Sequence, residues 1–200
     1  MDIVEGLVSV MLANWPVWFV TITLIVAAVI DGFQLRVPNS ITFPMIISGW
    51  VFSAAAGYVG GFEWCEGLAW YQCLGYSLLG SIVGLLLLLP AYAIGGMGAG
   101  DVKLMAGIGA WMHCTTTIYS FGISAVIGAI LAVGMAFYVR GFKKHSTQFF
   151  SIFNEIMTIK DPVALSEIAA ERKPTMLLLP YGIPIAMGTI GYFIVNGMLV

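Results

Sequence analysis

The feature that most restricts the fold of this sequence is a series of apolar runs long enough to cross a lipid bilayer. Residues 70–94 contain no charged side chain, and a helix that rises about 1.5 Å per residue crosses the hydrocarbon core in about 20 residues. Only 9% of the chain is charged, against about 25% in soluble domains. We therefore expect an all-α integral membrane protein in which residues 1–200 form a single membrane-embedded domain. Six transmembrane helices are expected, at about 15–36, 41–59, 70–94, 101–114, 116–139 and 177–199.

The basic residues predict how these helices are oriented. If the N-terminus lies outside, every basic residue falls in an inside segment, at Arg36, Lys103, Arg140, Lys143, Lys144, Lys160, Arg172 and Lys173. Cytoplasmic segments of membrane proteins carry an excess of Lys and Arg. We therefore expect a multi-pass protein of the cytoplasmic (inner) membrane with both termini outside. The net charge of −2 and the lack of a basic stripe argue against binding to nucleic acid.

Two further expectations concern the second half of the chain. Residues 101–139 are few for two crossings, so the fourth helix is expected to be short and to end in a tight turn near Thr115–Thr117. Residues 140–175 are polar, and apolar side chains recur at helical spacing within 146–160. Such spacing is typical of a helix at the membrane interface. An interfacial or cytoplasmic helical segment is expected between the fifth and sixth helices, either resting on the membrane or contacting a substrate.

Two carboxylates lie inside apolar runs, where a charge is costly. Asp31 is near the end of the first helix and Asp101 near the start of the fourth, so the topology places both at the cytoplasmic ends of their helices. Taken singly, Asp101 could be a helix N-cap, and Asp31 could pair with Arg36 or reach the headgroups. Taken together, at one depth of the membrane, they form a candidate catalytic pair.

Two close carboxylates do not both ionise easily, so they share one proton. The ionised member can then accept a proton from water while the protonated member polarises a carbonyl group, which equips the pair for peptide hydrolysis. Negative charge is favoured at the start of a helix. We therefore expect Asp101 to carry the charge and Asp31 to hold the proton.

Glycines precede the second of these carboxylates, in "GGMGAG" at 95–100. The absence of side chains at Gly98 and Gly100 lets a peptide approach the backbone closely, although a simple flexible turn is the alternative. Gly80 and Gly84, by contrast, have the spacing of a contact between two helices.

A second irregular segment opens the last helix, where Pro180 and Gly182 flank Tyr181. Irregular backbone at membrane depth is tolerated only against protein or a water-filled cavity. We place this break beside the aspartates, as part of a candidate substrate-binding loop. Lys103 is either a topology determinant or a further residue of that site.

The cysteines and histidines do not indicate a metal site. Cys65, Cys73 and Cys114 lack metal-ligand spacing and are interpreted as small apolar residues, although a Cys65–Cys73 disulfide is compatible with an oxidising outer compartment. His113 and His145 are expected near opposite faces of the membrane. No metal ligand set is therefore predicted.

Three segments resemble the type IV prepilin peptidases, which are membrane aspartyl proteases with a G-x-G-D motif. "GAGDVK" at 98–103 matches their G-x-G-D-x-K motif, "DGFQLRVPN" at 31–39 resembles the segment of their first aspartate, and "LPYGIPIA" at 179–186 resembles their C-terminal P-[YF]-G-x-P-like element. The resemblance implies that Asp31 and Asp101 are the catalytic pair, and that no cofactor is needed. It also implies cleavage, at the cytoplasmic face, of the short basic leader of prepilin-like proteins, typically after a glycine.

The resemblance is to a short form of that family, similar to the peptidases of Tad/Flp pilus systems or to archaeal preflagellin peptidases. Because the first apolar run begins almost at once and no N-terminal cysteine cluster is present, N-methyltransfer is not expected. The implied partners are a prepilin-like substrate, the bilayer and pilus or secretion machinery. Two other hypotheses remain: a proton-coupled transporter or channel that uses the paired carboxylates, and a catalytically silent assembly subunit.

Overall fold

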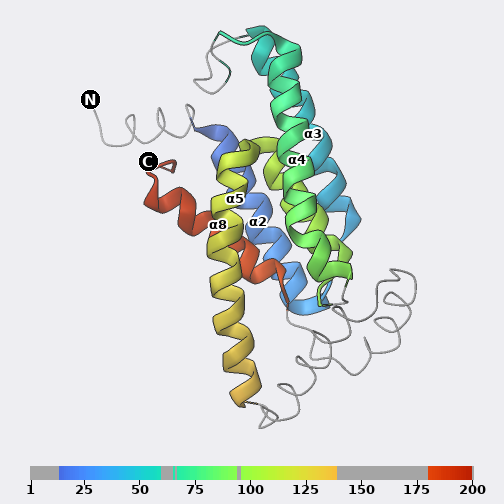
Figure 1. The fold of residues 1–200 in the computed structure, drawn as a ribbon, viewed down its shortest axis with the longest axis vertical. Coiled ribbons are helices and arrows are strands. Elements are labelled where there is room, and N and C mark those ends of the chain that lie inside the picture. Colours follow the sequence, from blue (N-terminus) through green and yellow to red (C-terminus); the bar gives the residue numbers. More distant parts are fainter. Residues whose placement is uncertain (1–13, 60–64, 66, 94–95, 139–179, 200) are drawn as a thin grey trace.

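The computed structural model describes residues 14–59, 65, 67–93, 96–138 and 180–199, and these residues form an all-helical bundle without a strand (Figure 1). The expected interfacial segment at 140–175 and the orientation of the N-terminus fall outside these residues. Four helices are long and apolar enough to cross a membrane, which confirms a multi-pass membrane protein. In chain order the helices are α2 (Trp15–Gln34), α3 (Asn39–Val59), α4 (Trp70–Ala93), α5 (Ala99–Tyr138) and α8 (Gly182–Val195).

The first three of these helices begin and end within two residues of the expected bounds. Their limits follow from local chemistry: Pro16 lies in the first turn of α2, where its missing N–H is not needed. At the other end, Leu35 adopts a left-handed conformation with φ 51°, and its N–H bonds to the carbonyl oxygen of Asp31. This αL cap ends the helix one turn after Asp31.

α5 consists of two helices joined by a sharp break at His113, where φ is 59° and ψ is −175°. Met105 and Ala132 line the same cavity, although a straight helix would separate them by about 40 Å. The chain therefore folds back at His113, into a first arm (99–112) and a second arm (114–138) that extends beyond the other helices (Figure 1). The turn lies two residues before the expected Thr115–Thr117.

The last helix is shorter than expected. The apolar run at 177–199 predicted a full span, but α8 begins at Gly182 and ends at Val195. Its 14 residues rise about 21 Å, less than the hydrocarbon thickness of about 30 Å. Pro180 lies outside the helix, and Pro184 is tolerated because it falls in the first turn.

The first arm of α5 packs tightly against α4 through small residues. A Cβ added to Gly80 would overlap the carbonyl oxygen of Gly109, and one added to Gly84 would overlap that of Met105. The Ser77 hydroxyl donates a hydrogen bond to the carbonyl oxygen of Ala110 across the same contact. Small residues allow such close approach in membrane bundles, so the spacing of Gly80 and Gly84 is confirmed as a helix contact.

This contact predicts a difference between two glycines of one helix. Gly84→Val should lower the free energy of unfolding by about 1–3 kcal/mol, because the new side chain meets backbone that cannot move aside. Gly75 has no atom within 4 Å of its would-be Cβ, so Gly75→Val carries the same change in helix propensity without the clash. Thermal unfolding in detergent, followed by circular dichroism, measures both. Equal destabilisation by the two variants would contradict the packing assigned to Gly84.

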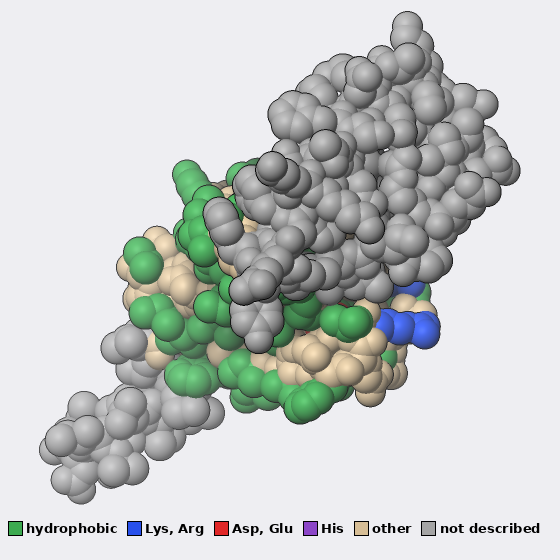
Figure 2. Space-filling model, turned by 90° about the horizontal axis from the view of Figure 1, so that it is seen from below, with side chains coloured by type: hydrophobic (Ala, Val, Ile, Leu, Met, Phe, Trp, Pro, Cys, Tyr) green, Lys and Arg blue, Asp and Glu red, His purple; other side chains and the backbone are tan. Residues whose placement is uncertain are grey.

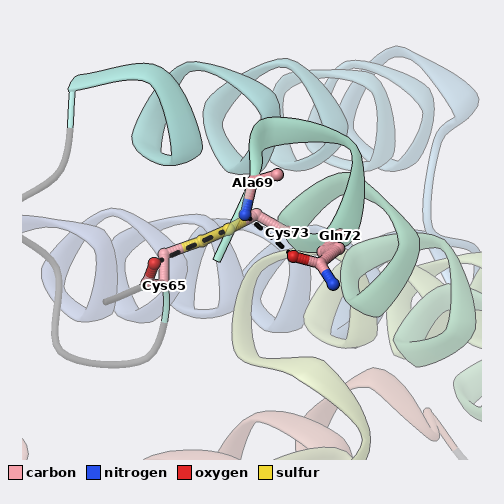
Figure 3. Close-up of a disulfide and its surroundings, with 4 residues drawn as sticks. All are labelled: Cys65, Ala69, Gln72 and Cys73. Atoms are coloured by element: carbon pink, nitrogen blue, oxygen red, sulfur yellow. Dashed lines mark hydrogen bonds between the residues drawn. A yellow bond between two sulfur atoms is a disulfide. The ribbon is translucent and has the colours of Figure 1, made fainter. Parts of the chain in front are cut away.

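Cys65 and Cys73 form a disulfide that ties the segment before α4 to that helix (Figure 3). Both cysteines are buried beside Ala56 near the end of α3. The Ala69 N–H donates a hydrogen bond to the Gln72 side chain in the first turn of α4. The pairing that the sequence left open is therefore formed, and Cys114 is a free thiol.

The surface of the described bundle is strongly apolar, as expected of a protein in lipid. Large hydrophobic side chains such as Ile22, Val29 and Val126 are more than half exposed. Figure 2 views the molecule from below and shows hydrophobic side chains over much of the described surface, with Lys and Arg side chains at one edge. The arrangement agrees with lipid-facing walls and a basic end.

Candidate active site

Asp31 lies one turn before the end of α2, and its side chain turns into the protein. It is 2% exposed, and its Oδ2 accepts a hydrogen bond of 2.7 Å from the backbone N–H of Gly182, 151 residues further along the chain. Gly182 is the first residue of α8, where backbone N–H groups lack helical partners. Arg36, the partner considered for Asp31, is exposed, and the described residues provide no ion pair for Asp31.

Asp101 is the third residue of α5 and is 5% exposed. Its Oδ2 accepts a hydrogen bond of 3.1 Å from the N–H of Gly98, the residue before the helix, as the third residue of a capping box does. Asp101 is therefore not itself the N-cap. Its other oxygen, Oδ1, is buried without a hydrogen-bond partner among the described residues. Capping uses one oxygen and leaves the second available.

The fold brings the two carboxylates close enough to interact electrostatically. Asp31 lies near the C-terminus of its own helix, α2. Its side chain nevertheless binds the N-terminus of another helix, α8. Negative charge on Asp31 is thereby stabilised as well. The structure therefore does not support the expectation that helix dipoles alone assign the charge to Asp101 and the proton to Asp31.

The segment before α8 borders both carboxylates. Burial raises the pKa of the Tyr181 phenol above its ordinary 10.0, and negative charge on Asp101 raises it further, so the hydroxyl stays protonated near neutral pH. Pro180 precedes it, and the carbonyl oxygen of Pro180 accepts a hydrogen bond from Ile183 N–H in the first turn of α8. The sequence placed Pro180, Tyr181 and Gly182 beside the aspartates; in the structure Gly182 binds Asp31 and Tyr181 lies near enough to Asp101 to be influenced by its charge.

The glycines before Asp101 serve close packing. A Cβ on Gly100 would lie 2.5 Å from the carbonyl oxygen of Val37, so only glycine lets the start of α5 approach the link between α2 and α3. A Cβ on Gly98 would lie 3.2 Å from Asp101 Oδ2. Both glycines therefore help to fix where Asp101 sits relative to α2.

The Lys103 side chain contacts α3. Its ammonium group donates a hydrogen bond of 3.0 Å to the Asn39 side chain and lies 4.6 Å from the centre of the Phe43 ring. Both partners are in the first turns of α3, so Lys103 ties α5 to α3. Among the described residues no cluster of three or more His, Cys, Asp and Glu side chains could hold a metal ion.

Residues of the second arm of α5, which the sequence did not place at the site, also border it. Gly128 and Ala129 line a cavity that also includes Tyr181 and Met97. They were interpreted only as part of a membrane span. The signal was a row of small residues, Ala125, Gly128, Ala129 and Ala132, at spacings of three and four.

The arrangement is thus a multi-pass helical membrane protein with two buried, interacting carboxylates at one end of its bundle. Each carboxylate accepts a hydrogen bond from one backbone N–H, and Oδ1 of Asp101 remains available to bind water. Such a pair is suited to acid–base hydrolysis.

The chain belongs to the type IV leader peptidase family, whose model matches residues 18–133, more than half of its length. The match includes both aspartates and the two motifs around them, and it confirms the resemblance to this family. It makes the chain a member of an aspartic peptidase family.

Curated relatives carry the name prepilin leader peptidase/N-methyltransferase. The protein of Aeromonas salmonicida (strain A449) is 27% identical over 137 residues, which are 65% of this chain and 40% of the relative. The protein of Neisseria gonorrhoeae is 32% identical over 115 residues, 58% of this chain and 38% of the relative. The matched region thus spans about two fifths of the length of these relatives. No solved structure matches.

Proposed function

We propose that this chain is an aspartyl endopeptidase that removes the basic leader of prepilin-like proteins at the cytoplasmic face of the inner membrane. The observation that carries the proposal is that Asp31 and Asp101 are both buried, each accept a hydrogen bond from a backbone N–H, and lie close enough to interact electrostatically. Family membership and the names of the relatives support the substrate class. A prepilin-like substrate and the bilayer are the partners, with pilus or secretion machinery beyond them.

The reaction needs only the two carboxylates and water. The ionised carboxylate takes a proton from water as the water oxygen attacks the scissile carbonyl carbon, and the protonated carboxylate gives its proton to the carbonyl oxygen. The tetrahedral intermediate returns that proton, and the proton taken from water passes to the departing nitrogen. The products are a carboxylic acid and an amine, and the pair again holds one proton. The unpartnered Oδ1 of Asp101 is a suitable acceptor for the water.

The Cys65–Cys73 disulfide supports an orientation in which the carboxylates lie at the cytoplasmic face. The disulfide packs against the end of α3, whereas Asn39 at the start of α3 bonds to Lys103, two residues after Asp101. A helix of 21 residues, about 30 Å, separates the two ends. Disulfides persist in oxidising compartments. A disulfide on the outer side of the membrane therefore agrees with carboxylates at the cytoplasmic side.

Product analysis tests the proposal. Purified wild-type protein in detergent or liposomes should cut a purified prepilin once, at the end of its basic leader. In water labelled with oxygen-18, one labelled oxygen should enter the new C-terminal carboxylate, because water attacks the carbonyl carbon directly. Folded protein that leaves the prepilin intact would contradict the proposal. If the same preparation carried protons across liposomes, the transporter hypothesis, which nothing in the family comparison supports, would replace it.

A further inference from the structure

A cavity of about 310 Å³ lies between α4, the second arm of α5 and α8. We call it the apolar groove. Its walls are almost wholly apolar and it is open along one side, with Leu88, Met105, Phe121, Ala129, Tyr181 and Ile185 among the lining residues. The volume is at the lower end of the range of about 300–1,000 Å³ found for ligand pockets. An open apolar groove of this size in a membrane protein can receive apolar side chains.

Two residues that line the apolar groove are chain neighbours of the backbone donors that bind the carboxylate pair. Met97 lines the groove and precedes Gly98, whose N–H binds Asp101. Tyr181 lines it as well and precedes Gly182, whose N–H binds Asp31. One wall residue therefore adjoins each backbone donor. A peptide held at the aspartates would meet the groove with its next residues.

We infer that the apolar groove receives the apolar residues on the C-terminal side of the scissile bond of a membrane-embedded peptide, an inference that rests on the proposed function. The basic leader on the other side of that bond cannot occupy apolar walls, because removing unpaired charges from water is too costly. The groove therefore takes the residues that follow the cut. Binding of these residues in the groove fixes where the scissile bond lies relative to the two carboxylates.

The second arm of α5 presents small side chains to the apolar groove. Ala125, Ala129 and Ala132 line the groove and are exposed, so this face presents small side chains where the rest of the arm presents Val126, Ile130 and other large ones. Small residues let another helix or an extended peptide approach the backbone closely. A lipid acyl chain would also fit apolar walls. A lipid site would not have to adjoin the carboxylates, however, whereas a substrate site must.

A substitution within the groove, compared with a neighbour outside it, tests the inference. Ala129→Trp fills the groove, whereas Ile130→Trp places the same side chain on the exposed surface of the same turn. Two substrates are compared: a full prepilin, and a peptide that ends a few residues after the scissile bond. Ala129→Trp should lower the preference for the full prepilin, measured as the ratio of kcat/KM values, by about ten-fold or more. Ile130→Trp should leave that ratio as in wild type.

The outcomes separate the inference from the proposed function. If wild type cuts neither substrate, both fail. If wild type cuts both, and Ala129→Trp keeps the wild-type preference or Ile130→Trp loses it equally, the groove does not bind the substrate. Ala132→Leu provides a smaller change at another exposed groove residue, should Ala129→Trp not fold. A photo-crosslinking residue at position 129 should become bonded to the full prepilin, and bonding to lipid alone would overturn the inference.

Discussion

Asp31→Asn and Asp101→Asn should each lower kcat/KM for prepilin cleavage by at least about 10³-fold, the scale of general acid–base catalysis. The amide has nearly the shape of the carboxylate, so its oxygen can still accept the N–H of Gly182 or Gly98 and the fold should persist. It cannot take a proton from water. Cleavage of purified prepilin in detergent, followed by mass spectrometry, measures the loss.

Two controls define this result. The double variant Asp31→Asn/Asp101→Asn should be no less active than either single variant, because residues that act as one unit are not additive. Thr42→Val removes a buried hydroxyl of α3 that has no hydrogen-bond partner among the described residues, and it should keep near wild-type activity. Pilus assembly at the wild-type level by either Asn variant would favour the silent assembly subunit and remove the catalytic role from the pair.

Most of the helical arrangement could be predicted from sequence because it follows from local properties. Apolar run length located α2, α3 and α4, since a span needs about 20 apolar residues. The same topology placed Asp31 at the end of one helix and Asp101 at the start of another running the opposite way. The nearness of the two carboxylates could therefore be predicted from the order of the spans, without knowledge of side-chain packing.

The contacts that complete the site could not be obtained in this way. The partner of Asp31 is a backbone N–H 151 residues away, and backbone N–H groups have no sequence signature. The helix-dipole comparison used α2 and α5 alone and left out the N-terminus of α8, whose first N–H binds Asp31, so the assignment of the proton within the pair stays a prediction. The fold-back at His113 likewise depends on a single residue with φ 59°, and it brings the second arm of α5 beside the site.

Lys103 illustrates a different limit. The motif around Asp101 suggested two roles for this lysine, as a topology determinant or as a residue of the substrate site. Its ammonium group bonds to Asn39, a residue whose position relative to α5 depends on the packing of Gly100 against Val37. The sequence position of a lysine fixes where its side chain leaves the helix. The position of its ammonium group depends on the neighbouring helix that it contacts.

Gly182→Ala should lower kcat for prepilin cleavage by about 10–100-fold with a smaller change in KM, since a misplacement of about 1 Å in a catalytic group has effects of this size. The added Cβ would lie 2.9 Å from Asp31 Oδ2 and 3.0 Å from Asp31 Cβ. Either the carboxylate or the start of α8 must move away. The backbone N–H remains, so the variant tests position rather than loss of a donor. Steady-state kinetics on purified prepilin measures it.

A graded pair of variants distinguishes this displacement from general instability. Gly191→Ala lies in the same helix, and its Cβ would have no atom within 4 Å, so it should retain wild-type kcat. At Gly98 the added Cβ would lie 3.2 Å from Asp101 Oδ2, a less severe overlap with an oxygen at the end of a side chain, so Gly98→Ala should have an effect between the two. If Gly182→Ala keeps wild-type kcat while Gly98→Ala loses it, the close contact between α8 and Asp31 does not position the catalytic carboxylate. The site would then depend on Asp101 and its own turn alone.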